Sequence, residues 1–329
     1  MATWKKLATL GSGSYATVYL IALDFPDESN RKIVAVKSSS HLSYSIASLK
    51  KEKKILELFK GCKEIIQCYF DQYAVEKYVS YNLFMELAPY GSLGELIRKR
   101  GAISEDTVRI YTHMLLKGLH CIHEKEVVHC DLKPDNILLF PTWKSETWYQ
   151  VKIADFGLAK TRKEAKAEFR LRKMKFRGTP YYMSPESVIG VIGTALDIWS
   201  LGCIVIEMIT GMDAWRNIEN QEELMLKLLL HKEAPPIPDG LSWVCKDFLG
   251  KCFVKNPTRR STAAMLLNHP FIISAYHNNM QTSRTAYETS SQSVGPPERY
   301  GVWYIYQSVC QHHIEVSSPS FYGVNEQQA

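Results

Sequence analysis

Two short polar motifs constrain this chain more than any other feature. Residues 129–136 read His-Cys-Asp-Leu-Lys-Pro-Asp-Asn, and residues 155–157 read Asp-Phe-Gly. Phosphoryl transfer needs a group that positions a hydroxyl, ligands for metal ions on the phosphates, and positive charge where negative charge develops. The motifs hold residues for these tasks: Asp131 to orient and deprotonate the hydroxyl, Lys133 to steady the phosphoryl group, and Asn136 and Asp155 to hold Mg2+. A chain that uses both motifs has to fold so that they face one cleft.

A glycine-containing stretch near the start, residues 10–18, reads Leu-Gly-Ser-Gly-Ser-Tyr-Ala-Thr-Val. Small residues let backbone amides approach phosphate oxygens, although such a stretch alone is more often a turn. The apolar, β-branched run 33–36 that follows predicts a strand ending at a lysine, where a cation can reach nucleotide phosphates. The alternatives are an ordinary turn for residues 10–18 and a solvated surface lysine for Lys37. The order of loop, strand and lysine favours phosphate binding over both. The candidate phosphate-contacting residues are Gly11, Ser12, Gly13 and Lys37.

A lysine that binds nucleotide phosphates needs a carboxylate partner to hold it in place. Residues 45–59 place apolar side chains among charges at a spacing that predicts an amphipathic helix. Its two acids are Glu52 and Glu57. We select Glu52 as the partner of Lys37, because Leu56 lies one turn further on the same face and can pack inward. The alternative is a surface glutamate that pairs with a neighbouring lysine of its own helix.

Residues 84–91 predict a strand that runs into a turn, where an adenine ring finds an apolar slot and two backbone hydrogen bonds. Backbone groups of Glu86 and Ala88 are the candidates for those bonds. The candidate walls of the slot are Leu10, Val18, Ala35 and Leu138, with Met85 at the back. The alternative for these apolar residues is ordinary core packing, and the neighbouring motifs favour the slot.

In this order the motifs resemble those of the eukaryotic protein kinase family, over residues 1–273. The resemblance implies an α+β, two-lobed protein kinase fold that binds ATP and Mg2+ between its lobes. It implies a small β-rich N-lobe over about 1–86, a hinge over about 86–91 and a large helical C-lobe over about 92–273. The Asp-Leu-Lys-Pro context of Lys133, and Thr179 in the loop that contacts the residue after the target, imply serine/threonine specificity.

The resemblance also implies several structural roles. Ser-Pro-Glu at 184–186 stands where the family usually has Ala-Pro-Glu, and Glu186 is expected to form a buried ion pair with Arg260. Asp197 is expected to anchor the catalytic loop. His129 and Phe156 belong to the two polar motifs and are expected to be structural.

A narrower resemblance is to plant MEKK-like MAP kinase kinase kinases of the short, kinase-domain-only type. It rests on His-Cys-Asp in the catalytic loop and on the runs 81–84, 178–180 and 251–256. The implied substrate is a MAP kinase kinase, phosphorylated on serine or threonine in its own activation loop. The alternatives are a serine/threonine kinase outside such a cascade, or a pseudokinase scaffold. Pseudokinases usually lose the strand lysine, the catalytic aspartate or a metal ligand, and this chain keeps all of them.

Cys130 replaces an arginine that many kinases have beside the catalytic aspartate. That arginine is neutralised when a phosphate arrives on the activation loop. Between Thr161 and Thr179 the chain has no serine, threonine or tyrosine, and residues 162–177 hold eight bases and two acids, a net charge of 8 − 2 = +6. We expect a charged loop here that needs no phosphorylation. It either attracts an acidic partner or is simply solvated, and without interleaved aromatic residues it does not favour nucleic acid.

Length and composition set the remaining expectations. The 329 residues suffice for one two-lobed unit and a tail. Residues 274–298 are rich in polar residues and predict a flexible linker, and 299–329 form an aromatic tail that docks on the large lobe, binds a partner or is disordered. No signal or membrane-spanning run is evident, and the eight cysteines lack a Cys-x-x-Cys pair, which indicates free thiols. We expect a monomer in the cytoplasm, with a nuclear share left open, that binds neither membrane nor nucleic acid.

Overall fold

The computed structural model describes residues 3–13, 16–24, 32–40, 42–75, 78–142, 148–171, 177–218 and 220–273. The chain divides into two compact units, 1–286 and 287–329, and everything below concerns the first. The linker expected at 274–298 and the aromatic tail expected at 299–329 lie outside the described residues.

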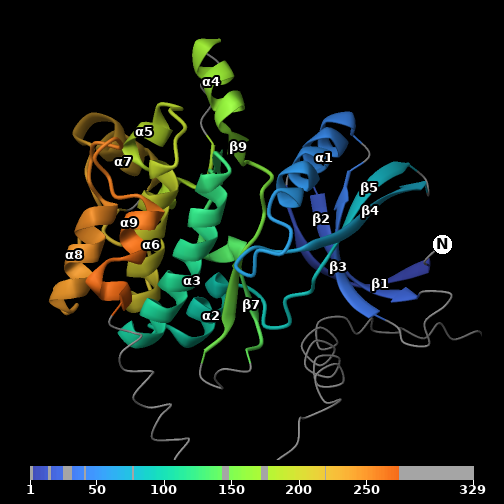
Figure 1. Ribbon diagram of the computed structural model, residues 1–329, viewed down its shortest axis with the longest axis horizontal. Helices are drawn as coiled ribbons and strands as arrows, with labels where there is room; N and C mark the ends of the chain where they lie inside the picture. The colour runs from blue at the N-terminus through green and yellow to red at the C-terminus, as the bar shows by residue number, and fades with distance from the viewer. Residues whose placement is uncertain are drawn as a thin grey trace, which may run out of the picture. The chain divides into compact units, whose positions relative to one another are not determined.

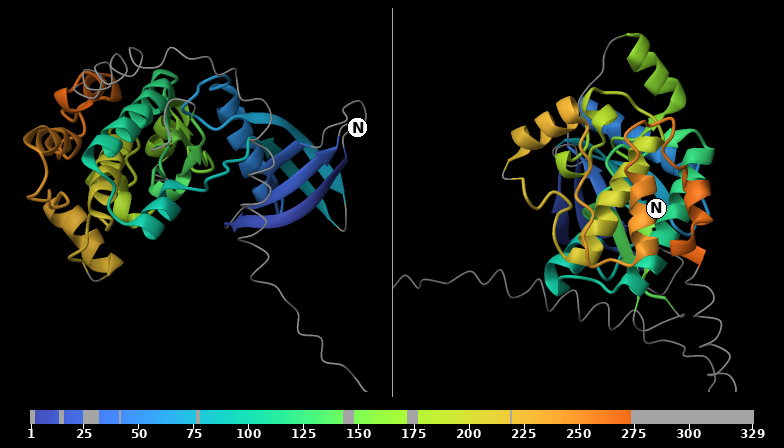
Figure 2. Two further views of the ribbon diagram at one scale, coloured as in Figure 1. Left: turned by 90° about the horizontal axis from the view of Figure 1, so that it is seen from below. Right: turned by 90° about the vertical axis from the view of Figure 1, so that its left-hand side faces the viewer.

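The N-terminal lobe is a twisted antiparallel sheet of five strands (Figures 1 and 2). The strands pair in the order β1-β2-β3-β5-β4, and their bounds are β1 Thr3–Ser12, β2 Ala16–Asp24, β3 Lys32–Ser39, β4 Cys68–Val75 and β5 Val79–Met85. One face is covered by aromatic and β-branched side chains, with the Phe70 ring stacked 4.3 Å from that of Phe84. This register brings Lys37 in β3 opposite Leu83 in β5, two positions from the strand end at Met85.

Helix α1, Ser43–Glu57, packs against this sheet (Figure 1). The helix was expected over residues 45–59, so the observed bounds lie two residues earlier at each end. Leu49, Glu52 and Leu56 are all buried and share one face, because they are three or four residues apart. The burial of Leu56 fixes the rotation of the helix, which turns Glu52 towards the sheet.

The C-terminal lobe is mainly helical (Figure 1). Its core helix α6 is buried almost all round, and the helices α3, α8 and α9 supply much of the surrounding apolar packing. None of the helices in the described ranges is both long enough and apolar enough to span a membrane. Besides helix α4, described below, the helices are α2 Leu93–Arg100, α3 Glu105–Glu124, α5 Pro185–Val188, α6 Ala195–Thr210, α7 Gln221–Leu226 with a π-helical turn Lys227–His231, α8 Trp243–Cys252 and α9 Ala263–Leu267. The expected α+β architecture, a β-rich N-lobe and a helical C-lobe, is confirmed.

Four short strands and a 3-10 turn position the loops between the lobes. Strand β6, Val127–Val128, pairs with β9, Lys160–Thr161, and β7, Ile137–Phe140, pairs with β8, Gln150–Ile153. The 3-10 turn Pro134–Asn136 leads directly into β7. Both polar motifs are therefore held between paired strands. Residues 143–147, which connect β7 and β8, lie outside the described part of the chain.

A loop was expected over residues 162–177. This expectation is wrong for the first half, which forms helix α4, Arg162–Arg170. Thr161 and Glu164 form a capping box at its start, each side chain accepting from the other residue's backbone N–H. The segment is rich in Lys, Arg, Glu and Ala, all strong helix formers, and lacks Pro and Gly. Counting charges alone missed this signature, although Thr-x-x-Glu predicts a helix start.

A buried ion pair ties α5 to the end of the C-lobe. Arg260 Nη1 lies 2.5 Å from Glu186 Oε1, and the arginine side chain is 0% exposed. The guanidinium also donates to the carbonyls of Ala195 and Val254 and lies over the Trp199 ring. Every face of this buried cation therefore has a partner.

Replacing Arg260 with methionine should lower the free energy of unfolding by about 3–5 kcal/mol, because it leaves the Glu186 carboxylate buried and unpaired. Thermal unfolding of both proteins measures the change. The variant Lys251→Met is the matched control, since it breaks an exposed helical pair with Asp247 and should change stability by less than about 1 kcal/mol. Equal losses in the two variants would contradict the structural importance of the buried pair.

Candidate active site

Asp197, near the start of α6, anchors the loop that carries the first motif. Its buried carboxylate accepts hydrogen bonds from the backbone N–H groups of His129 (2.9 Å) and Cys130 (3.1 Å), and lies 2.9 Å from His123 Nε2. Cys130 has φ +68°, a conformation that costs energy for a non-glycine residue. The two bonds from successive amides hold this strained turn, so that the next residue, Asp131, is presented at a fixed position.

His129 joins the first motif to the second. Its Nε2 lies 3.0 Å from the carbonyl oxygen of Ala154, while Nδ1 accepts from the Asp131 N–H at 3.3 Å. These bonds assign the proton of the neutral ring to Nε2. The imidazole also packs edge-on against Phe156, at 4.9 Å between ring centres. The imidazole therefore fixes the spacing between Asp131 and the residue after Ala154, Asp155.

Asp131 lies at the centre of a polar cluster. Its Oδ1 accepts from the hydroxyl of Thr179 at 2.8 Å, and its Oδ2 lies 3.0 Å from Lys133 Nζ. Lys133 also donates to Thr179 Oγ1 at 2.9 Å. The amide nitrogen of Asn136 donates to the Asp131 carbonyl (2.8 Å) and, more weakly, to its carboxylate (3.3 Å). A proton acceptor, a cation and an amide are thus held within one hydrogen-bonded group.

Lys37 reaches across the cleft between the lobes. Its Nζ lies 2.7 Å from both carboxylate oxygens of Glu52 and 2.9 Å from Asp155 Oδ1. Burial lowers the pKa of Lys37, but the two carboxylates outweigh it and raise the pKa above its usual range, so the amine is a cation. The structure places Glu52, and not Glu57, against this lysine, while Glu57 pairs on the surface with Lys53.

Asp155 and Asn136 offer oxygen ligands of the kind that Mg2+ prefers. Burial would raise the pKa of Asp155, but Lys37 lowers it to about 2, so the group is a carboxylate at neutral pH. Its side chain is 48% exposed and therefore open to a solvated ion. The backbone N–H of Ala154 donates to the Asn136 carbonyl at 2.8 Å, which keeps the two ligands side by side. The donor set fits a hard divalent cation.

The proposed nucleotide slot is assembled from the strands of the N-lobe and β7. Ala35 in β3 pairs with Met85 in β5, and Gly11 in β1 pairs with Val18 in β2. Ala35 and Met85 are buried, whereas Leu10 on β1 is exposed, and Leu138 on β7 is partly buried. Ser12 and Gly13 are exposed at the end of β1, and the Gly13 N–H donates to the carbonyl of Ala16.

The hinge residue Glu86 is held by contacts with Gln67 and Lys152 that its sequence does not predict. The backbone N–H of Glu86 donates to the Gln67 carbonyl at 3.1 Å, so its carbonyl is the group that remains to meet a base edge. The Glu86 carboxylate is held 2.6 Å from Lys152 on β8 and accepts from the Gln67 N–H. Ala88 packs against the large apolar cluster, and its carbonyl accepts from Gly91.

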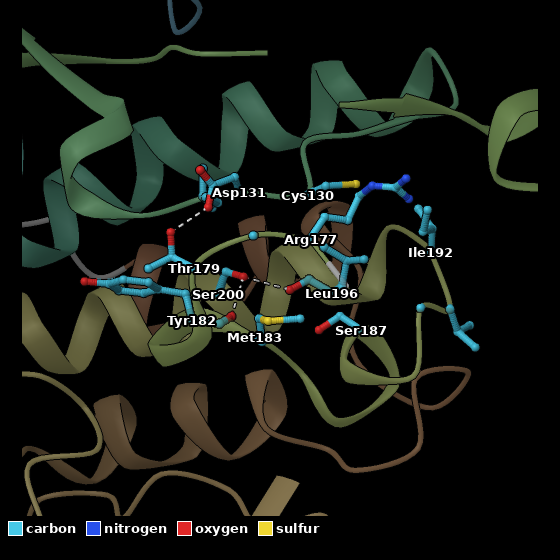
Figure 3. A pocket seen from close by; sticks show the side chains of 14 residues that line it. Cys130, Asp131, Arg177, Thr179, Tyr182, Met183, Ser187, Ile192, Leu196 and Ser200 are labelled. Carbon is cyan, nitrogen blue, oxygen red and sulfur yellow. Dashed lines mark hydrogen bonds between the residues drawn. The ribbon is translucent and has the colours of Figure 1, made fainter. Parts of the chain in front are cut away.

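A pocket opens beside Asp131 on the side of the C-lobe (Figure 3). Its lining includes the polar side chains of Thr179 and Arg177 and the apolar side chains of Ile192 and Leu196. Figure 3 shows the hydrogen bond between Thr179 and Asp131 at the edge of this pocket, next to Cys130.

Sequence reasoning missed the ion pairs that hold the segment between the two motifs 155–157 and 184–186, here called the activation segment. They join α4 to α1, to β9 and to the residue just before Gly178. The Thr-x-x-Glu signature and the four-residue spacing of its acids were the available signals. The residues involved are Lys51, Lys160, Glu164, Glu168 and Arg177.

Comparison with known proteins shows which family this chain belongs to. Residues 4–272 match the protein kinase domain family. The chain is similar to mitogen-activated protein kinase kinase kinase 20 of Arabidopsis thaliana, with 41% identity over 82% of this chain and 78% of that protein. Mitogen-activated protein kinase kinase kinase 17 of the same plant is 39% identical over 82% of this chain and 69% of its own length. Mitogen-activated protein kinase kinase kinase A of Dictyostelium discoideum is 33% identical over 84% of this chain, and the match covers 28% of that protein's length.

Proposed function

The chain belongs to the protein kinase family and is a serine/threonine kinase, and we propose that its substrate is the activation loop of a MAP kinase kinase. The observation that carries the substrate proposal is the similarity, over most of both chains, to relatives that are named MAP kinase kinase kinases. The Asp131, Lys133 and Thr179 cluster supports it, because this cluster is built to receive an aliphatic hydroxyl.

We assign the chemical roles from the geometry of the cleft. Asp131 orients the substrate hydroxyl and accepts its proton, because its carboxylate is the acceptor at the centre of the cluster. Lys133 compensates the negative charge that develops nearby. Thr179 holds the two side chains in fixed positions, because its hydroxyl donates to the Asp131 carboxylate and accepts from the Lys133 amine. Their fixed positions mean that little reorganisation is needed when the substrate arrives.

The nucleotide side of the cleft uses a second set of residues. Members of the family use ATP and Mg2+, which supply the phosphoryl group and the charge that stabilises its transfer. Lys37, held by Glu52, would bind the nucleotide phosphates, and Asp155 and Asn136 would hold the metal. The residues proposed to contact the phosphates or enclose the base are Leu10, Gly11, Ser12, Gly13, Val18, Ala35, Met85, Glu86, Ala88 and Leu138.

A panel of catalytically inactive MAP kinase kinases tests the substrate proposal. The purified chain is incubated with each member and labelled ATP, and the phosphorylated residues are mapped by mass spectrometry. We expect serine or threonine phosphorylation in the activation loop of at least one member, and none with the variant Asp131→Asn. Phosphorylation of a generic basic protein, but of no panel member, would contradict the substrate proposal and favour a kinase outside such cascades.

Activity should not depend on phosphorylation of the activation segment. Cys130 is buried, and burial raises the pKa of its thiol, so the residue carries no charge that a phosphate would neutralise. Treating the purified kinase with a phosphatase should change kcat by less than about twofold. The variant Thr161→Asn is the matched test, because asparagine caps a helix as well as threonine does and cannot be phosphorylated. A large loss of activity in either experiment would contradict this prediction.

A further inference from the structure

Helix α4 turns its acids inward and its bases outward. Figure 1 shows it standing apart from the other helices, and it has no fully buried residue. Its partly buried positions are Glu164, Ala165 and Glu168, and Glu168 lies three and four residues after the other two, on the same side of the helix. Apolar packing therefore does not hold this helix. The contacts of the two glutamates have to do so.

Glu168 is held between two cations. Its Oε1 lies 2.6 Å from Lys160 Nζ, and its Oε2 lies 2.6 Å from Arg177 Nη1, with a weaker contact of 3.3 Å from Nη2 to Oε1. The side chains of Lys160 and Arg177 are only 16% and 13% exposed. Burial would raise the pKa of Glu168, but the two cations lower it below its usual range, so the group is a carboxylate.

Both cations are attached to the phosphotransfer machinery. Lys160 in β9 pairs with Val128 in β6, the residue that precedes His129. Arg177 precedes Gly178, whose φ is +100° and where an added Cβ would lie 2.7 Å from the Cys130 carbonyl oxygen. The backbone after Arg177 thus runs directly across the catalytic loop. One residue further, Thr179 donates to Asp131.

Glu164 connects the same helix to the N-lobe. Its Oε1 lies 3.0 Å from Lys51 Nζ, and Lys51 also donates to the Ala159 carbonyl at 2.8 Å. Lys51 is the neighbour of Glu52 on α1, the residue that holds Lys37. The two glutamates of α4 therefore act on both halves of the cleft, one on the Glu52 side and one on the Asp131 side.

Cations with so little exposure need a counter-charge, since an unpaired buried charge is costly. Cys130 supplies no charge at this place, and residues 162–178 contain no hydroxyl that could take a phosphate. The three cations Lys51, Lys160 and Arg177 face two carboxylates within this cluster. The counter-charge is thus part of the polypeptide and is present as soon as α4 has folded.

We propose that Glu168, supported by Glu164, is a positioning residue that replaces an activating phosphate and holds the activation segment in its working arrangement. The proposal rests on the kinase function proposed above and adds how that function is kept switched on. Because the anion is built in, the kinase would be active when synthesised, and its output would follow its abundance.

Anion rescue of the variant Glu168→Ala tests the proposal. This change leaves Lys160 and Arg177 around a space into which a small anion can fit. We expect kcat on a generic basic protein to fall about tenfold or more, with KM for ATP changed by less than about twofold. Sulfate should restore a large part of the lost kcat, whereas chloride at the same ionic strength should not. The control Glu223→Ala removes a glutamate that pairs only on the surface of α7 and should retain wild-type kcat.

A wild-type kcat in Glu168→Ala, or a loss that sulfate fails to restore, would overturn the proposal. Amide hydrogen exchange of residues 177–182 gives a readout that does not depend on phosphoryl transfer. We expect faster exchange there in Glu168→Ala and slower exchange when sulfate is added, and unchanged exchange would also overturn the proposal. If no MAP kinase kinase is phosphorylated while the generic substrate is, the substrate proposal fails and the role of Glu168 stands.

Discussion

Replacing Asp131 with asparagine should lower kcat by about 10² to 10⁴-fold while the fold stays intact. Asparagine has nearly the same shape, but its amide cannot accept the proton of the substrate hydroxyl. Thr179 and Lys133 contact different oxygens of the Asp131 carboxylate. Asparagine keeps only one acceptor oxygen and no negative charge, so Lys133 also loses its ion pair. Labelled phosphate transfer to a generic basic protein measures the effect.

The control lies in the same motif. Asp135→Asn makes the identical chemical change at an exposed carboxylate, which pairs with Arg98 at 2.9 Å. This variant should retain most of the wild-type rate, because exposed pairs contribute little. Equal thermal unfolding of both variants and of the wild type would show that the fold is unchanged. Transfer by Asp131→Asn at a rate close to wild type would contradict the assignment of Asp131 as the base.

Replacing Lys37 with methionine should reduce kcat by about a hundredfold or more, because the variant loses a cation that Glu52 and Asp155 both hold between the lobes. It also leaves the buried Glu52 carboxylate without its partner. Lys53→Met is the matched control, since it removes a lysine of α1 that, among the described residues, pairs with Glu57 and Asp71 and not with Glu52 or Asp155. Similar rates in the two variants would contradict a role for Lys37 in phosphate binding.

The same variant should alter the acid side of the stability profile. Lys37 lowers the pKa of Asp155 from its ordinary value of 3.8 to about 2. A lowered carboxylate pKa contributes stability that is fully present above pH 3.8 and is lost as the pH falls towards 2. Without Lys37 this contribution disappears, so Lys37→Met should lose less stability than wild type between these pH values. Chemical unfolding at several pH values checks this.

Local patterns predicted the parts of the cleft that depend on short spacing. The choice of Glu52 over Glu57 was possible because Leu56 marks the inward face of α1, and a helical face is set by spacing alone. The strand ending near Lys37 was likewise visible from its β-branched residues. In each case one element carries both the functional residue and the apolar neighbours that orient it.

Side-chain contacts between one element and the next were beyond the reach of such patterns. Glu168 on α4 pairs with Lys160 on β9 and with Arg177 beyond the helix, and no spacing in the sequence encodes these two contacts. The net charge of residues 162–177 predicts a loop that attracts an acidic partner or is solvated, because a sum of charges does not show that residues 162–170 form a helix with two different faces. The capping signature at Thr161 would have revealed the helix, but not which cations its acids meet.

The central claim is that this cleft is assembled for phosphoryl transfer without any added modification. Its most direct test uses protein that a phosphatase has treated and whose intact mass shows no phosphate. The measurement is the initial rate of label transfer from ATP to a generic basic protein in the presence of Mg2+, with phosphoamino-acid analysis of the product. We predict phosphoserine and phosphothreonine at a rate of about 1 s⁻¹ or more. A protein that binds ATP but transfers label no faster than Asp131→Asn would contradict the account.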